Sequence, residues 1–570
     1  MRKLFFLPII CLLIGTPVLT LGQKKEEIPQ PAYEVEVIVT NIDVFVTDKK
    51  GNRVTGLNPE NFEIYEDGVL QNITNFYEVR GMDVYASVHD RDKKDLVVPP
   101  KPLSKRTPQF SNKIIIFFDN WHLHPLNRNW SIKKLESFIR NNFSIANETN
   151  QGMIVCLDQK LEILQDFTSS QGALLQAMEE VKRRSNQSLF RRRIKEDLKK
   201  EVNRIVRETK RESRYEEYER ALGYARNYVE AEQNDIQHSI KSMNAFIDYL
   251  TGIEGKKMLI YVCDGLPINP AEEFFSFLDQ TFPLGTARTE VLNYDLSRLY
   301  RELTARCNAN EIALYPINAQ GLESAILSAD KETGWNIYSR GSGMVKQGTR
   351  AKNEALQLMA RETGGLAILN TNNIKSGLDH IKDDLQFYYS LGYVSSHRED
   401  NVYHSIQVRL VGVKEEYSIR LRHGYKRISF EDKIKESVFS RLYLKRQYNP
   451  MNIKVQILPL KTIPGTNKLC FTLKFLIPIK NLTLFFREKD YIGKIKLYIA
   501  LMDSEGRVSP CHELSHQIII PVQDYETALK RIYPYLAEMY VFPGDYIISL
   551  AVRDVPGEVL SFIQFERTIR

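Results

Sequence analysis

The chain has 570 residues, of which 43% are hydrophobic and 26% are charged, a composition typical of globular proteins. This length exceeds what one hydrophobic core organises, so we expect two to four domains. Lysine and arginine outnumber aspartate and glutamate by 78 to 71, a net charge of +7. That excess is small for the length, and nucleic-acid binding, which needs a concentrated basic face, is not expected.

The first 22 residues, MRKLFFLPIICLLIGTPVLTLG, follow the pattern of a secretory signal peptide. Arg2 and Lys3 precede an apolar run, and small residues follow near Gly22, where we expect cleavage. A retained membrane anchor is the rival interpretation, but Pro8 and Pro17 break the run, which is short for a span. No later segment is apolar enough to cross a bilayer. We therefore predict an exported chain at a periplasmic, cell-surface or extracellular location.

Cleavage would leave five cysteines: Cys156, Cys263, Cys307, Cys470 and Cys511. An odd number in an exported protein leaves at least one free thiol. Cys156 and Cys263 lie in apolar, strand-like runs and are expected to be buried. Cys470 and Cys511 could pair with each other, although a chain of this size does not need disulfides for stability.

Residues 35–80 alternate apolar and polar side chains, as strands do, in EVEVIVTNIDVFVTD and EIYEDGVLQNITNFYEV. Glycines and an Asp-Gly pair separate the short strands, so we predict an N-terminal β unit. Residues 81–112 are charged and contain prolines, and we interpret them as a linker.

From residue 113 to about 395, the apolar runs KIIIFFD, GMIVCLD, KKMLIYVCDG and IALYPINAQG alternate with amphipathic helical patterns. This alternation predicts an α/β domain with a doubly wound, mostly parallel sheet that helices cover on both faces. Ligands bind such sheets in the crevice beyond the carboxyl ends of the strands. Asp119 and Asp264 each come directly after an apolar strand, so both are expected to point into that crevice.

Residues 171–250 form an unusually long helical stretch, which we interpret as an antiparallel helical hairpin inserted into the α/β domain. One helix carries a narrow apolar stripe, which we call the hairpin seam; it consists of Phe190, Ile194, Leu198, Val202 and Ile205. A solvated helix pair without a partner is the alternative. The basic run FRRRIK could contact an anionic lipid or polymer, but charges of both signs surround it.

Two alternating strands in residues 396–430 are expected to return to the N-terminal β unit, so that the α/β domain is inserted into a β domain. Residues 435–570 then contain short alternating strands with Gly, Pro and Asp turns, which predict a C-terminal β-sandwich.

The order of KIIIFFD, IYVCDG and IALYPINAQG resembles the von Willebrand factor type A domain. Four further stretches resemble the bacterial VWFA-related family first described in Acidobacteria: VTDKKGNRVTGLNPENFEIYEDG, LEILQDFTSS, MARETGGLAILNTNN, and FYYSLGYV followed by a strand and LRHGY. The resemblance covers roughly residues 37–425. It implies a type A-like doubly wound α/β domain that binds proteins or matrix, often through a divalent cation.

In type A domains that cation occupies a metal-ion-dependent adhesion site with an Asp-x-Ser-x-Ser run, a threonine and a later aspartate, and Mg²⁺ suits such oxygen ligands. By this resemblance Asp119 matches the first aspartate and Asp264 the last. Trp121 and Leu123 stand at the two serine positions and offer no oxygen. The threonine equivalent is missing too: Thr168 belongs to a hairpin end, and near RRSNQS only Ser185 or Ser188 could substitute. We therefore predict a degenerate site in which Asp119 and Asp264 cap loops and helix starts.

Two patterns raise the alternative of a metal-dependent hydrolase. HELSH, from His512 to His516, matches H-E-x-x-H, which binds zinc when it lies on a helix. A preceding proline and the strand-like QIIIPV after it favour a strand or loop instead. His122 and His124 form an H-x-H pair beside Asp119, a set that suits Zn²⁺; polar loop residues are the alternative.

Cys263 lies beside Asp264, but no histidine partner for it is identifiable, and no nucleophile with its base is evident. The sequence therefore favours an exported, non-enzymatic interaction or adhesion protein that binds a protein or cell-surface polymer. No cofactor is certain, and Mg²⁺ or another divalent cation is the candidate. A structural envelope component is the third hypothesis, and the oligomeric state is open.

Overall fold

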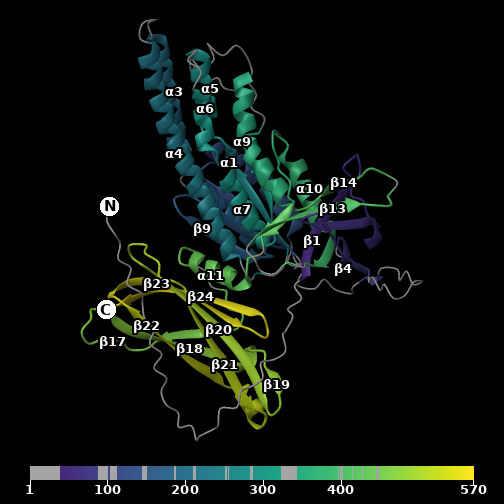
Figure 1. The fold of residues 1–570 in the computed structure, drawn as a ribbon, viewed down its shortest axis with the longest axis vertical. Coiled ribbons are helices and arrows are strands. Elements are labelled where there is room, and N and C mark those ends of the chain that lie inside the picture. Colours follow the sequence, from purple (N-terminus) through teal and green to yellow (C-terminus); the bar gives the residue numbers. More distant parts are fainter. Residues whose placement is uncertain are drawn as a thin grey trace. The chain divides into compact units, whose positions relative to one another are not determined.

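The structure, a computed structural model, describes residues 39–81, 83–87, 101–102, 112–143, 150–184, 188–208, 214–250, 253, 256–282, 287–321, 343–395, 397, 402–413, 415–426, 428–444 and 448–570. The predicted signal peptide lies outside these residues. Among the described helices, none combines the length and apolarity that crossing a membrane requires. The chain divides into two compact units, residues 38–430 and residues 431–570 (Figure 1).

The first unit contains two antiparallel sheets around one apolar core. The six-stranded sheet has the order β14-β1-β12-β4-β5-β6 and the four-stranded sheet the order β15-β13-β2-β3. Their strands are β1 (Val39–Thr47), β2 (Phe62–Glu66), β3 (Val69–Gln71), β4 (Ile73–Arg80), β5 (Asp83–Ser87), β6 (Lys101–Pro102), β12 (Phe387–Val394), β13 (Tyr403–Leu410), β14 (Ser418–Arg420) and β15 (Gly424–Lys426). Alternate residues such as Ile42, Phe62 and Leu391 bury their side chains in the shared core.

The expected return of the chain to the N-terminal strands is present, because β13 pairs with β2 and β14 pairs with β1. The sheet also takes strands from outside the predicted β unit. β12 falls within residues 113–395, yet it pairs with β1 and β4. β5 and β6 fall within the predicted linker, and β5 pairs with β4.

A five-stranded sheet forms the centre of the α/β part, in the order β11-β10-β7-β8-β9. The strands are β7 (Asn112–Asp119), β8 (Asn150–Leu157), β9 (Leu161–Thr168), β10 (Lys256–Cys263) and β11 (Ile312–Asn318). β11, β10, β7 and β8 are parallel, whereas β9 at the edge is antiparallel. β7 is buried almost throughout, which explains its continuous apolar run.

Helices pack against both faces of this sheet. Ile114, Ile116 and Phe118 share a core with α1 (Pro125–Asn142), α2 (Gln171–Arg183) and α10 (Ile374–Gln386). Phe117 points to the opposite face and meets Phe246 edge to face, with ring centroids 5.8 Å apart. On that face lie α4 (Arg214–Tyr249), α7 (Ser297–Ala309) and α9 (Gly343–Glu362).

The helical hairpin consists of α3 (Ser188–Glu208) and the first part of α4, which stand side by side in Figure 1. It is shorter than the predicted range of 171–250, because α2 packs on α1 as part of the α/β layers. Val202 and Ile205 of α3 share a core with Tyr218 and Leu222 of α4. That core also includes residues of α5 (Glu272–Thr281) and α6 (Ala287–Glu290).

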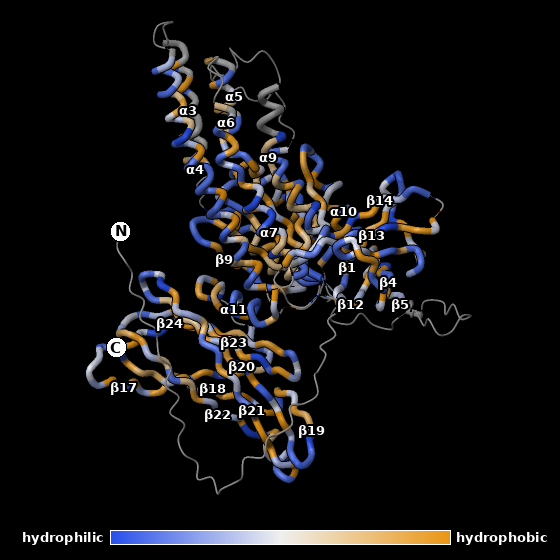
Figure 2. Tube along the Cα trace, viewed as in Figure 1, coloured by the Kyte–Doolittle hydropathy of each residue, from blue (hydrophilic) through white to orange (hydrophobic). Residues whose placement is uncertain are grey.

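The second unit begins with α11 (Phe430–Ser440) and continues as two antiparallel sheets around one core, the arrangement of a β-sandwich. One sheet contains β16 (Lys454–Ile457), β17 (Lys461–Thr462), β18 (Leu469–Pro478) and β22 (Ile532–Val541). The other contains β19 (Phe485–Arg487), β20 (Asp490–Asp503), β21 (His512–Pro521), β23 (Gly544–Asp554) and β24 (Val559–Ile569). Figure 2 shows hydrophobic and hydrophilic residues alternating along these strands.

The suggested pair of Cys470 and Cys511 is not formed, and both are free thiols. Cys470 lies in β18 of one sheet, opposite Tyr540 of β22. Cys511 directly precedes β21 of the other sheet. The two cysteines therefore belong to different sheets of the sandwich.

Candidate functional site

Asp119 ends β7 at the carboxyl edge of the parallel sheet, as expected, and its side chain is completely buried. One carboxylate oxygen accepts hydrogen bonds from the backbone N–H groups of Trp121 (3.1 Å) and His122 (3.2 Å). The other accepts one from the Tyr261 hydroxyl at 2.5 Å and lies 3.1 Å from Nδ1 of His122. Four groups of the protein thus surround the two oxygens, which is about the acceptor capacity of a carboxylate.

Asp264 follows β10 and holds the other end of the same loop, residues 120–124. Its Oδ2 accepts a hydrogen bond from the His124 backbone at 2.8 Å, and its Oδ1 accepts one from the Asn127 amide at 3.0 Å. Its own backbone N–H donates to the carbonyl of His122 at 2.9 Å. The two predicted site residues therefore lie on either side of one loop and fix it, which is the capping role that the sequence suggested.

The pKa values of the two carboxyls are shifted in opposite directions. Burial would raise the pKa of Asp119, but the charge and hydrogen bond of His122 and the Tyr261 hydroxyl outweigh it, so that pKa lies below its ordinary value. For Asp264, burial dominates over the hydrogen bonds from His124 and Asn127 and raises the pKa to about 6. Asp119 is held as an anion, whereas Asp264 titrates near neutrality.

The two serine positions and Thr168 supply no ligand for an adhesion site at this edge. Leu123 is fully buried and Trp121 partly buried, and neither supplies an oxygen. Thr168 pairs with Gly152, which pairs with Ile114, so it lies at the other end of the sheet, roughly 17 Å from the level of Asp119. Ser185 lies outside the described residues, and Ser188 is the first residue of α3.

The hairpin helix α4 touches this loop directly. The Ser239 hydroxyl lies 3.0 Å from Nδ1 of His122, and the His238 ring packs against Trp121 with centroids 4.8 Å apart. Ser239 and Asp119 thus contact the same nitrogen of His122. A hydrolase triad needs the serine and the carboxylate on opposite nitrogens of the ring, so this arrangement anchors a helix rather than activating a nucleophile.

The predicted His122/His124 zinc pair is not assembled. His122 serves Asp119 and Ser239, while His124 is the N-cap of α1. Nδ1 of His124 accepts a hydrogen bond from the backbone of Leu126 at 3.3 Å. The two imidazoles have separate structural partners, which supports their interpretation as polar loop residues.

HELSH forms the first half of strand β21 and not a helix, which confirms the strand interpretation and contradicts the zinc-helix geometry. On a strand, residues four apart are separated by roughly 13 Å, and neighbours point to opposite faces. His516 turns inward and bonds the Tyr533 hydroxyl at 2.5 Å, while Glu513 is exposed. His512, Glu513 and His516 therefore cannot converge on one ion.

The thiols near the sheet edge are inert. Burial, with a further contribution from Asp119, raises the pKa of Cys263 well above its usual value. Burial raises the pKa of Cys156 as well. Because the thiolate is the nucleophilic form, neither cysteine is prepared for nucleophilic attack at neutral pH.

A cavity of about 320 Å³ lies at the amino edge of the parallel sheet, away from Asp119 and Asp264, where β10 and β11 begin beside the six-stranded sheet. Lys256 in its wall pairs with Asp43 at 3.0 Å and sits 3.6 Å from the Tyr388 ring centroid. Burial lowers the pKa of Lys256, against the opposing effect of Asp43. Arg422 donates to the carbonyls of Asn41 and Asn308. These charged groups join the two sheets.

Three residues of the loop site were missed by the sequence analysis: Tyr261, Ser239 and Asn127. Tyr261 is a hydroxyl inside the apolar run KKMLIYVC, and that signal could have marked it as a partner for a buried acid. Ser239 and Asn127 lie in ordinary polar positions of helices, and no local pattern distinguishes them.

No family model and no curated protein matches the chain. Among solved structures, a structural-genomics target is similar over 21% of this chain and 84% of its own, at 16% identity and a TM-score of 0.14. A Bordetella pertussis protein assigned as ApaA is similar over 21% and 91%, at 12% identity and 0.13. A Bacteroides uniformis beta-glucuronidase is similar over 32% and 19%, at 7% identity and 0.14. TM-scores this low carry no argument about fold or function.

Proposed function

We propose that residues 113–395 include a type A-like, doubly wound α/β domain of the VWFA-related kind. The strand order supports this, because the chain runs outward from β7 through β8 to the antiparallel edge strand β9 and then returns to β10 on the other side of β7. The strand order therefore reverses between β7 and β10. Ligands of open α/β sheets bind at the carboxyl ends of strands at such a reversal.

The protein is, in this proposal, an exported and non-enzymatic interaction protein that binds a protein or surface polymer. The observation that carries it is the hairpin, whose helix α4 contacts the Asp119 loop through Ser239 and His238. The hairpin therefore rises from the edge at which type A domains bind their ligands. From Ser239 back to Arg214, α4 extends about 37 Å.

The hairpin seam provides the binding surface in this proposal. Val202 and Ile205 are buried against α4, but Phe190 is 64% exposed, and Ile194 is exposed as well. The neighbouring Leu189 adds another exposed apolar side chain. Exposed apolar side chains at a spacing of one helical turn, as at Phe190 and Ile194, are typical of helices that bind a partner. The side chains of Arg191 and Arg192 in FRRRIK lie outside the described residues.

Metal-bridged adhesion is not part of the proposal, because the oxygens of Asp119 are already occupied by hydrogen-bond donors of the protein. Mg²⁺ would have to displace Tyr261 and His122 and find further oxygens at positions held by Trp121 and Leu123. The carboxylates instead keep the base of the hairpin in place.

The test is photo-crosslinking with p-benzoylphenylalanine placed at Phe190, using the mature protein and envelope fractions of the source bacterium. The matched control places it at Phe485, an aromatic residue of the C-terminal unit that is 59% exposed. We expect a discrete crosslinked partner from position 190 alone. Phe190→Ser with Ile194→Ser should then weaken that partner's affinity at least about tenfold, since aromatic anchors dominate interfaces.

Removal of divalent cations with a chelator should leave the affinity for the crosslinked partner unchanged. Crosslinking from position 485 alone would move binding to the C-terminal unit and overturn the proposal. Binding that requires Mg²⁺ and is lost in Asp119→Asn would restore metal-bridged adhesion. The absence of any crosslinked partner would favour the structural envelope component.

A further inference from the structure

A second set of potential metal ligands lies in the N-terminal β part, far along the chain from Asp119. Asp67 occupies the turn between β2 and β3, His397 follows β12, and His404 lies in β13. One ligand atom from each of these residues lies within 4.8 Å of the other two. We call Asp67, His397 and His404 the His–Asp cluster.

The distances in the His–Asp cluster suit a small cation. Nδ1 of His404 lies 2.8 Å and Nε2 of His397 lies 3.6 Å from Oδ2 of Asp67. In a tetrahedral zinc site with bonds of about 2.0 Å, neighbouring ligand atoms are about 3.3 Å apart. The two observed distances lie on either side of that value, and all three ligand atoms lie within 4.8 Å of one another, so the side chains must move closer to bring them to one ion.

The other oxygen of Asp67 is fixed in the way that metal-binding carboxylates usually are. Its Oδ1 accepts hydrogen bonds from the backbone N–H and the hydroxyl of Ser405, at 2.8 and 3.1 Å. The backbone of Asp67 has the left-handed conformation, with φ at 49°, and its N–H donates to the Ser405 carbonyl. Such outer contacts orient a ligand before the ion arrives.

The histidines are held by a buried network around Glu66, the residue before Asp67. Glu66 is completely buried and accepts hydrogen bonds from the hydroxyls of Tyr425 (2.6 Å) and Ser395 (2.9 Å). The Ser395 hydroxyl in turn accepts the backbone N–H of His397 at 3.2 Å. The His404 ring packs at 5.7 Å from the ring of Tyr425. The network thus connects the three segments that supply the ligands.

The two imidazole rings of the His–Asp cluster lie against each other. The imidazoles of His397 and His404 stack with centroids 4.2 Å apart and planes inclined by 24°. Because imidazole lone pairs lie in the ring planes, one ring must rotate before both nitrogens face the same ion.

We propose that Asp67, His397 and His404 bind a divalent transition-metal ion of the Zn²⁺ class. Two imidazoles and one carboxylate are ligands that Zn²⁺ takes and that Mg²⁺ and Ca²⁺ do not favour. Three protein ligands leave one tetrahedral position for water. The side chains of Asp67 and His397 are 39% and 40% exposed, so that position faces solvent. The ion joins the β2–β3 turn to the segment after β12.

The experiment uses the mature protein without a histidine tag, stripped with a chelator and titrated with Zn²⁺ by calorimetry and thermal melting. We expect one Zn²⁺ per chain and a rise in melting temperature, since the ion binds the native state. His397→Gln removes a partly exposed ligand and should weaken Zn²⁺ binding by at least about 10- to 100-fold. Changes to residues that only hydrogen-bond to metal ligands already lower metal affinity by that factor. Asp67→Asn is the second variant, and Mg²⁺ should give no shift.

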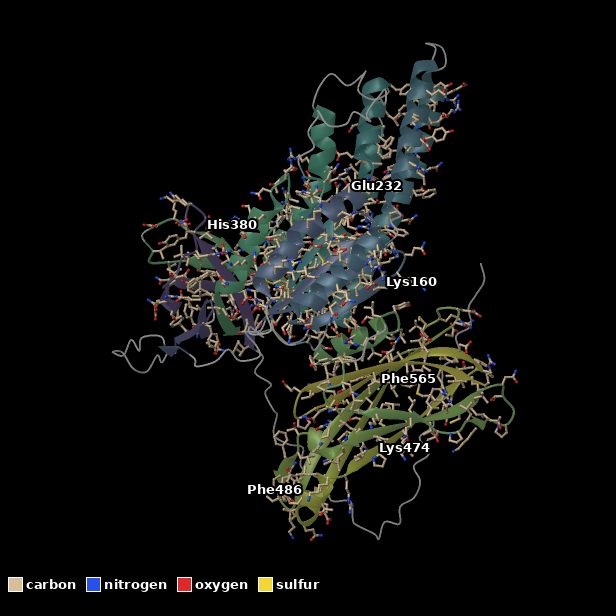
Figure 3. The ribbon with its side chains drawn as sticks, turned by 180° about the vertical axis from the view of Figure 1, so that it is seen from behind. Lys160, Glu232, His380, Lys474, Phe486 and Phe565 are labelled. Carbon is tan, nitrogen blue, oxygen red and sulfur yellow. The ribbon has the colours of Figure 1, made fainter. Side chains whose placement is uncertain are left out.

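The matched control is His380→Gln, on the surface of α10, where Figure 3 labels this exposed histidine. It should bind Zn²⁺ as the wild type does. Zn²⁺ binding that is absent from the wild type, or unchanged in both His397→Gln and Asp67→Asn, would overturn the proposal. Binding that is lost in His516→Ala and kept in His397→Gln would place the ion at β21. None of these results depends on the proposed function of the hairpin.

Discussion

At the scale of single residues, Asp119 and Asp264 both fix the same loop with hydrogen bonds, but the surroundings of the two carboxyl groups shift their pKa values in opposite directions. Asp119 is buried among hydrogen-bond donors that favour its charge, whereas Asp264 has fewer donors and a raised pKa. The sequence indicated that both would stand at the carboxyl edge, because each follows an apolar strand. It did not show the side-chain donors from other elements, Asn127 of α1 for Asp264 and Tyr261 of β10 for Asp119.

The raised pKa of Asp264 leads to a pH prediction. The unfolded chain ionises this carboxyl near its ordinary pKa of about 3.9, while the folded chain ionises it at about 6. The native state therefore binds more protons between these values, and the contribution of Asp264 to stability is lost as the pH rises through 6. We expect Asp264→Asn to remove a slope of at most about 1.4 kcal/mol per pH unit.

Urea denaturation at several pH values between 4 and 7 measures this slope. Near pH 7 the Asp264→Asn variant should be as stable as the wild type or more so, because the new amide oxygen can still accept the His124 N–H. Asp119→Asn is the matched control and should destabilise throughout this range, since its carboxylate is favoured by its surroundings. An unchanged slope in Asp264→Asn would contradict the assignment.

At the scale of elements, the hairpin seam is exposed in one part of α3 and buried in another. The spacing of three and four residues predicted a helix with a narrow apolar stripe, and α3 has it. The sequence could not tell which part of the stripe is covered, because this depends on where α4, α5 and α6 pack. Val202 is fully buried in that core, whereas Ile194 is exposed.

This difference in burial predicts that truncating the two side chains to alanine lowers the free energy of unfolding by different amounts. Val202→Ala removes two buried methyl groups and should lower the free energy of unfolding by about 2 kcal/mol. Ile194→Ala changes an exposed position and should stay within about 0.5 kcal/mol of the wild type. Chemical denaturation followed by circular dichroism compares them. Equal losses in the two variants would mean that the seam is covered along its whole length.

At the scale of the whole molecule, each of the two units has its own apolar core, around Ile116 and Ile42 in the first and Phe471 in the second. A unit with its own core can unfold on its own. We therefore expect calorimetry of the protein to resolve two transitions. Phe471→Ala should lower one of them and leave the other unchanged, while Ile116→Val should do the reverse. A single transition that both variants lower would show one cooperative unit.

One strand of the six-stranded sheet comes from a part of the chain that the sequence placed in another domain. Residues 387–394 were expected within the α/β range of residues 113–395. In the structure they lie between β1 and β4, strands from the beginning of the chain. Pairing of this kind depends on complementary edges that are distant in sequence, and a local pattern contains no information about it.

The sequence by itself determined the elements and their classes. Apolar runs produced the buried parallel strands, alternation produced the antiparallel ones, and a 3.6-residue period produced the hairpin, because burial acts on local periodicity. Only the tertiary structure decided which side chains meet. It brought the Tyr261 hydroxyl to Asp119, placed Ser239 of α4 against His122, and brought Asp67, His397 and His404 together. Such sites depend on the packing of distant segments, and local spacing does not encode it.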